Sequence, residues 1–85
     1  MTLKQPLVLV PGLSGRPDVD FPFLAPMLRR RFDVVEVTLA RAGGDGLPGL
    51  VAAVESAVRE CDSPPLLVGY SLGAVVAASV AASVS

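Results

Sequence analysis

A serine lies between two glycines in the segment Gly69-Tyr70-Ser71-Leu72-Gly73, which reads G-x-S-x-G. An apolar run, 66–70, precedes the serine, and an uncharged helical segment, 72–84, follows it. A serine in such a strand-to-helix turn projects its hydroxyl above the sheet, and glycines at both flanks avoid collisions with neighbouring backbone. The spacing therefore predicts a nucleophilic Ser71 beside a helix N-terminus, where free N–H groups stabilise negative charge.

Two other interpretations of this motif compete with the nucleophile. One is a structural turn built from small residues. The other is a membrane helix, because Gly69, Gly73 and Ala77 form a small-xxx-small series of the kind that packs helices in lipid. The position between a buried strand and a helix favours the nucleophile, since that context is the confirmation the motif requires.

Length and composition narrow the class of protein. The 85 residues allow at most one small domain, and 52% hydrophobic residues exclude a disordered tail. The formal net charge of −1 argues against a nucleic-acid partner. With no histidine and a single cysteine, Cys61, we expect no metal site. A lone thiol and the lack of a signal-peptide pattern predict a cytoplasmic protein.

A membrane interpretation rests on residues 63–85, which carry no charge. Residues 66–84 are long enough to span a bilayer. Leucine and valine in this segment favour insertion into a bilayer, but its many alanines, serines and glycines offset much of that free energy. No lysine or arginine flanks the segment to anchor it. A small membrane protein is therefore the weakest of the alternatives, and we expect no membrane partner.

The hydrophobic pattern predicts alternating strands and helices. Strands are expected at 7–10, 34–39 and 66–70, and helices at 23–31, 48–61 and 72–84, with a flexible loop at 40–46. The second strand contains Glu36 and Thr38, which indicates an edge or a half-exposed face. The helix 72–84 has no polar face, which is typical of a buried helix, and we expect it to lose part of its cover in the 85-residue chain. This order predicts an α/β fold, three-layer α/β/α with a parallel sheet.

The first predicted strand ends in Val10-Pro11-Gly12-Leu13-Ser14-Gly15. Together with the run from Val68 to Ala74, this segment resembles the α/β-hydrolase family, and its esterase and thioesterase members in particular. The resemblance covers nearly all 85 residues. It implies a central first strand and an oxyanion hole formed by the backbone N–H groups of Leu13 and Leu72. In the family a histidine stands where this chain has Pro11, but a backbone donor does not depend on that side chain.

The family's catalytic triad runs serine, then an acid, then histidine. No acid or histidine follows Ser71, and Asp18, Asp20, Asp33 and Asp45 precede it, so we interpret these four as solvated or capping carboxylates. We therefore expect residues 1–85 to be the N-terminal part of one α/β-hydrolase domain, truncated after the nucleophile helix, with a partial fold of three strands and about three helices. Alone, the chain is expected to be inactive.

The resemblance implies a serine hydrolase that cleaves a small-molecule ester or thioester through an acyl-Ser71 intermediate, without a cofactor. The alternative is a non-catalytic α/β module for binding or interaction. In either case, the unpaired edges of a three-stranded sheet predict self-association.

Overall fold

The computed structural model describes residues 4–39 and 46–84. Within these residues three strands alternate with four helices, which confirms the expected β-α-β-α-β-α order and adds one short helix. In chain order the elements are β1 (Gln5–Val10), α1 (Pro17–Asp20), α2 (Leu24–Leu28), β2 (Phe32–Glu36), α3 (Gly46–Arg59), β3 (Leu66–Gly69) and α4 (Leu72–Val84).

The three strands form one parallel sheet in the order β2-β1-β3. Leu7 of β1 pairs with Val34 of β2 on one side and with Leu66 of β3 on the other. The first strand is therefore central, as the resemblance implied, and the α/β fold with a parallel sheet is confirmed. Because the strands are parallel, their carboxyl ends lie at one edge of the sheet, which is where open α/β folds bind ligands.

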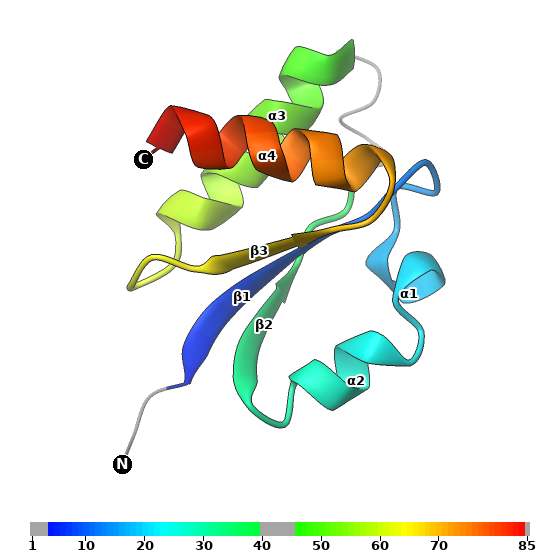
Figure 1. Cartoon of the computed structure of the whole chain (residues 1–85), viewed down its shortest axis with the longest axis vertical. Coiled ribbons are helices and arrows are strands. Elements are labelled where there is room, and N and C mark those ends of the chain that lie inside the picture. Colours follow the sequence, from blue (N-terminus) through cyan, green and yellow to red (C-terminus); the bar gives the residue numbers. More distant parts are fainter. Residues whose placement is uncertain (1–3, 40–45, 85) are drawn as a thin grey trace.

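Successive side chains of β1 enter two separate cores, because side chains of a strand alternate between the faces of the sheet. Val8 and Val10 pack with residues of α3 and α4, whereas Leu7 and Leu9 pack with Phe21 and Ala25. Figure 1 shows α3 and α4 on one side of the sheet and α1 and α2 on the other. This arrangement gives the three layers and explains why the β1 sequence is continuously apolar.

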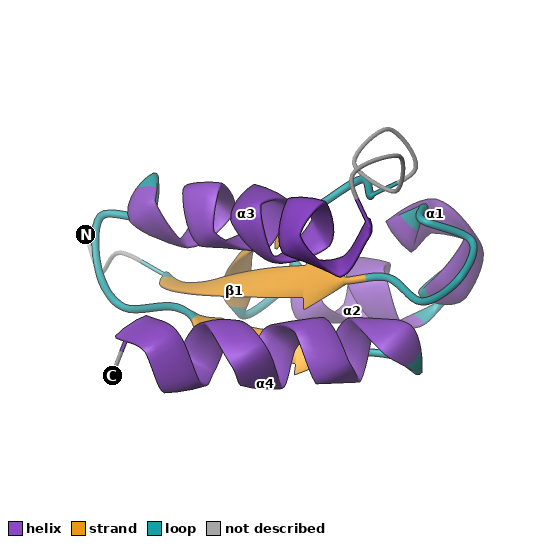
Figure 2. Ribbon diagram, turned by 90° about the horizontal axis from the view of Figure 1, so that it is seen from above, coloured by secondary structure: helices purple, strands orange, loops and turns teal. Residues whose placement is uncertain are grey.

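Helix α4 returns along the sheet in the direction opposite to β1, so its first turn lies near the carboxyl end of that strand (Figure 2). Its buried side is formed by Gly73, Val76, Ala77 and Val80, whereas Ala74, Val75 and Ala78 are exposed. The helix is therefore buried on one side only, which agrees with the expectation that it loses part of its cover in the 85-residue chain. Among the described residues, the sheet and α3 pack against it together with Val37 and Leu39, and these neighbours contact one side.

Two elements, β2 and α2, end three residues before the predicted boundary, whereas the other boundaries differ from the prediction by at most two residues. Strand β2 ends at Glu36 rather than at residue 39, because the chain turns toward β1 and its loop. Val37 N–H still donates to Leu9 O at 3.2 Å, but Leu39 N–H donates to Gly15 O at 2.7 Å. Helix α2 is shorter than 23–31, since Arg30 and Arg31 close tighter turns that end it. The predicted loop falls mostly on residues 40–45, which lie outside the described residues.

The membrane interpretation does not agree with the structure. Residues 66–84 form a four-residue strand, a turn and a 13-residue helix rather than one continuous helix. Within 4–39 and 46–84, none of the helices combines the length and the apolar character that crossing a bilayer requires.

We predict that Gly73→Ala destabilises the fold by about 2 kcal/mol, because a Cβ there would overlap the backbone oxygens of Val10 and Pro11. Helix propensity alone would give the opposite sign, a gain of about 1 kcal/mol for alanine over glycine. Urea unfolding of the two proteins measures the difference. Ser79→Ala, at an exposed position of the same helix, should stay within about 0.5 kcal/mol of the parent. A Gly73→Ala protein as stable as the parent would contradict the close contact.

Candidate active site

Ser71 forms the turn between β3 and α4 at the carboxyl edge of the sheet (Figure 1). Its φ is +55°, and no other non-glycine residue among those described has a positive φ. Hydrogen bonds from Gly73 N–H to Tyr70 O and from Ala74 N–H to Ser71 O, both 2.9 Å, close the turn. A left-handed backbone costs a residue with a side chain about 1 kcal/mol or more, so the surrounding structure holds Ser71 in a strained conformation.

Both glycines of the motif occupy places that have no room for a side chain. A Cβ on Gly69 would lie 2.6 Å from Ala74 N and would overlap Gly73 O. A Cβ on Gly73 would overlap the last carbonyl groups of β1, those of Val10 and Pro11. The turn that carries Ser71 is therefore packed against its own helix and against the end of β1.

The loop after β1 lies directly against Ser71. A Cβ on Gly12 would be 3.2 Å from the Cβ of Ser71 and 2.9 Å from Tyr70 O. The loop closes as a β-turn, with Gly15 N–H donating to Gly12 O at 3.0 Å and Gly15 at φ +69°. Leu13 is the second residue of this turn, and its side chain is 86% exposed.

The N–H groups of this loop are not equally engaged. Pro11 has none, and Gly12 N–H donates to Asp20 Oδ2 at 2.6 Å. Neither Leu13 N–H nor Leu72 N–H donates a hydrogen bond within the part of the chain that the structure describes. Leu72 begins α4, where the first N–H groups have no partner inside the helix. The two predicted oxyanion donors are thus unengaged, Leu72 next to Ser71 in the chain and Leu13 next to Gly12 in the loop, and their role stays a prediction.

The predicted carboxylates are not equivalent in the structure. Asp18 forms a surface ion pair with Arg16 at 2.7 Å, Asp33 is exposed on β2, and Asp45 lies outside the described residues. Asp20 instead binds the loop beside Ser71, through Gly12 N–H and the hydroxyl of Ser14. Sequence reasoning missed this contact, and no spacing rule signals it, because it depends on α1 folding back over the loop.

The described residues place no hydrogen-bonding base on the Ser71 hydroxyl. Ser71 Oγ has no hydrogen-bond partner among the residues described, and the sequence contains no histidine. Within the same residues no three histidine, cysteine or acidic side chains gather in a way that could hold a metal ion. The local chemistry is therefore that of a serine hydroxyl, backbone donors and apolar neighbours.

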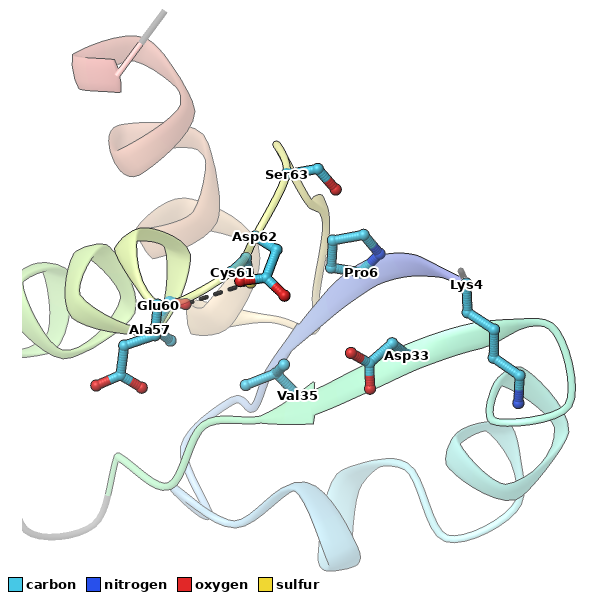
Figure 3. Close-up of a pocket in the computed structure, with 9 residues that line it drawn as sticks. All are labelled: Lys4, Pro6, Asp33, Val35, Ala57, Glu60, Cys61, Asp62 and Ser63. Atoms are coloured by element: carbon cyan, nitrogen blue, oxygen red, sulfur yellow. Dashed lines mark hydrogen bonds between the residues drawn. The ribbon is translucent and has the colours of Figure 1, made fainter. Parts of the chain in front are cut away.

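A separate hollow lies at the other end of the sheet, near the amino ends of β1 and β2 (Figure 3). It contains Cys61, whose thiol donates to Ala57 O at 3.4 Å. Burial raises the pKa of this thiol, and the negative charges of Asp33, Asp62 and Glu60 raise it further. A thiol that stays protonated is a poor nucleophile, so the surroundings of Cys61 do not activate it.

Comparison with known proteins agrees with this geometry. The model of the alpha/beta hydrolase family matches residues 7–85, from the middle of β1 through α4. The chain belongs to the alpha/beta hydrolase family. No curated protein and no solved structure matches it. The matched range includes both segments that meet at the candidate site of this α/β-hydrolase chain, the loop after β1 and the turn at Ser71.

We predict that Ser71→Gly gives a protein about 1 kcal/mol more stable than Ser71→Ala, because only glycine adopts a positive φ without strain. Both variants lack the hydroxyl, so the comparison isolates the backbone conformation. Urea unfolding measures the free energies. At Ser56, inside α3, the glycine variant should instead be less stable than the alanine variant, because glycine costs about 1 kcal/mol in a helix. The strained turn would be refuted by a Ser71→Gly protein less stable than Ser71→Ala.

Proposed function

We propose that this chain carries the nucleophile and the oxyanion hole of a serine hydrolase that cleaves small-molecule esters or thioesters. The observation that supports the proposal best is the position of Ser71. It lies at the carboxyl edge of the sheet with a positive φ. The loop beside it contains the unengaged N–H of Leu13, and the helix that follows it begins with the unengaged N–H of Leu72. Exposed Leu13 and Tyr70 give the site an apolar margin suited to an acyl group.

In the proposed reaction, Ser71 Oγ attacks the carbonyl carbon and its proton passes to a general base. The carbonyl oxygen becomes an anion that accepts hydrogen bonds from Leu13 N–H and Leu72 N–H. The carbon–oxygen or carbon–sulfur bond to the leaving group then breaks, and the leaving group takes the proton. Water attacks the acyl-Ser71 ester in the same way, releasing the acid and restoring the hydroxyl.

The general base comes, in this proposal, from outside these 85 residues. They contain no histidine, and no acid follows Ser71. Loss of the base lowers turnover by roughly 10⁴ to 10⁶ in serine hydrolases, so the chain alone is inactive toward esters. Residues 1–85 are then the first part of one catalytic domain. We place it in the cytoplasm, in keeping with its single free cysteine.

A second candidate function is a binding module without catalysis. The exposed apolar side of α4, with Ala74, Val75 and Ala78, favours it, because a surface of this kind accepts another protein element. This function needs no base, so it predicts that the Ser71 hydroxyl reacts like any other exposed serine.

We also propose that the isolated chain associates with itself. Within the described residues β2 and β3 are the two edges of the sheet, and each leaves one side of its backbone unpaired. Sedimentation of the purified chain should therefore show dimers or larger species. A single monomeric species that melts cooperatively would contradict this.

The nucleophile is tested on the 85-residue chain with a fluorophosphonate probe and added imidazole, which supplies the missing base from solution. Ser71 Oγ forms a bond to phosphorus, the P–F bond breaks and releases fluoride, and imidazole takes the proton of the serine hydroxyl. We expect imidazole to raise the labelling rate at Ser71 about tenfold. A positioned general base raises a rate by roughly 10² to 10⁴, and a base free in solution supplies only part of that factor. Intact mass and peptide mapping measure the rate and the site.

Two variants control the experiment. Ser71→Ala should take no label in this segment, and Ser79→Ala, which removes another exposed serine, should label like the parent. Without imidazole, the chain should hydrolyse p-nitrophenyl acetate no faster than Ser71→Ala does. If Ser71 and Ser79 react at similar rates with imidazole present, Ser71 is not activated and the binding module becomes the better account.

A further inference from the structure

The carboxylate of Asp20 holds the loop that passes Ser71. Its Oδ2 accepts hydrogen bonds from Gly12 N–H at 2.6 Å and from Ser14 Oγ at 2.8 Å. Ser14 Oγ also lies 3.1 Å from Arg16 O, but its single proton favours the shorter contact to the charged carboxylate. The same hydroxyl accepts from Arg16 N–H at 3.1 Å, which completes a closed set of bonds around the turn.

Asp20 is itself fixed by the fold. It ends α1, where its N–H donates to Arg16 O at 3.2 Å and Phe21 N–H donates to Pro17 O at 2.8 Å. The next side chain, Phe21, is buried in the core with Leu7 and Leu9. Its ring meets the ring of Tyr70 edge-on, with centroids 6.3 Å apart. The carboxylate is therefore anchored both to the core and to the residue that precedes Ser71.

These bonds fix the direction of the Leu13 N–H group in the loop beside Ser71. Gly12 N–H is taken by Asp20, and Gly12 O is held by Gly15 N–H at 3.0 Å. In a trans peptide the C=O and the N–H point in opposite directions. With Gly12 O held inside the turn, Leu13 N–H points out of it.

We propose that Asp20 is a positioning residue for the oxyanion hole. Its carboxylate fixes the peptide units of Gly12 and Leu13, so that Leu13 N–H is aimed before substrate binds. This inference rests on the proposed function, because it assigns Asp20 a role in the same site. Asp20 acts through the backbone of the loop and does not touch the reacting atoms.

Imidazole-assisted fluorophosphonate labelling of Ser71 tests this role on the 85-residue chain. We expect Asp20→Ala to label about tenfold more slowly, less than the roughly 10² to 10³ that loss of a whole oxyanion donor costs. Asp20→Asn keeps an oxygen that can accept from Gly12 N–H, so its rate should return to within about threefold of the parent. Asp18→Asn removes the same charge from the same helix without contacting the loop, and should label like the parent.

A double-substitution cycle separates this role from general stabilisation. Leu13 is the second residue of the β-turn, a position that proline favours, so Leu13→Pro removes the N–H while suiting the turn. Leu13→Ala keeps the N–H but removes the same apolar side chain, so it measures how much of the slowing in Leu13→Pro comes from the side chain rather than from the N–H. If Asp20 acts through Leu13 N–H, Asp20→Ala should slow labelling about tenfold in the parent and hardly at all in Leu13→Pro.

The outcomes are distinct. The positioning role would be overturned if Asp20→Ala slowed labelling by the same factor in Leu13→Pro as in the parent, or if Asp20→Ala alone labelled like the parent. Either result would leave the proposed nucleophile intact. A parent chain in which Ser71 labels no faster than Ser79 would overturn the proposed function, and the role of Asp20 with it. Should circular dichroism show Asp20→Ala to be unfolded, the cycle with Asp20→Asn decides, since its smaller slowing should also vanish in Leu13→Pro.

Discussion

The end of β1 and the turn that carries Ser71 meet backbone against backbone, and this contact determines the candidate site. It exists only because Gly12 and Gly73 lack side chains, since a Cβ at either would strike the opposite segment. The contact brings together two chain segments almost sixty residues apart, each contributing an unengaged N–H group. A site made of backbone donors needs this closeness, because such donors cannot reach across a gap as a long side chain can.

The rest of the fold holds the two segments in place. The interior residues of β1 are almost fully buried from both sides, which makes the strand a fixed reference for the loop that follows it. Helix α1 places Asp20 on that loop, and Phe21 anchors α1 in the core beside Leu7 and Leu9. The strain at Ser71 is sustained by the packing of β3 and α4 on either side of the turn.

The strongest periodic signals in the sequence predicted the fold well. The continuous apolar runs at β1 and β3 and the uncharged helix after Ser71 were located to within two residues, because burial on both faces leaves few other residue types. The family resemblance also gave the central position of β1. The tight turn at Gly69, Ser71 and Gly73 was predictable because such a turn restricts the residue types it accepts, whereas the role of Ser71 stays a prediction.

Features that depend on tertiary contacts were not predictable. Helix α1 has four residues, too few to show a period, so neither it nor the contact of Asp20 with Gly12 could be inferred. The end of β2 was misplaced because Val37 and Leu39 remain buried after the strand has ended. Partial exposure of α4 was expected, but its exposed residues were not identified, since a helix that is apolar all round gives no sign of which side is covered.

The most direct measurement is a crystal structure of the chain after fluorophosphonate has reacted with Ser71. The phosphonyl oxygen then occupies the place of the oxyanion. Our account predicts that it lies about 2.7–3.1 Å from both Leu13 N and Leu72 N, the distance expected of oxyanion donors. A phosphonyl oxygen directed into solvent, with neither nitrogen in reach, would contradict the claim that these two segments form an oxyanion hole around a nucleophilic serine.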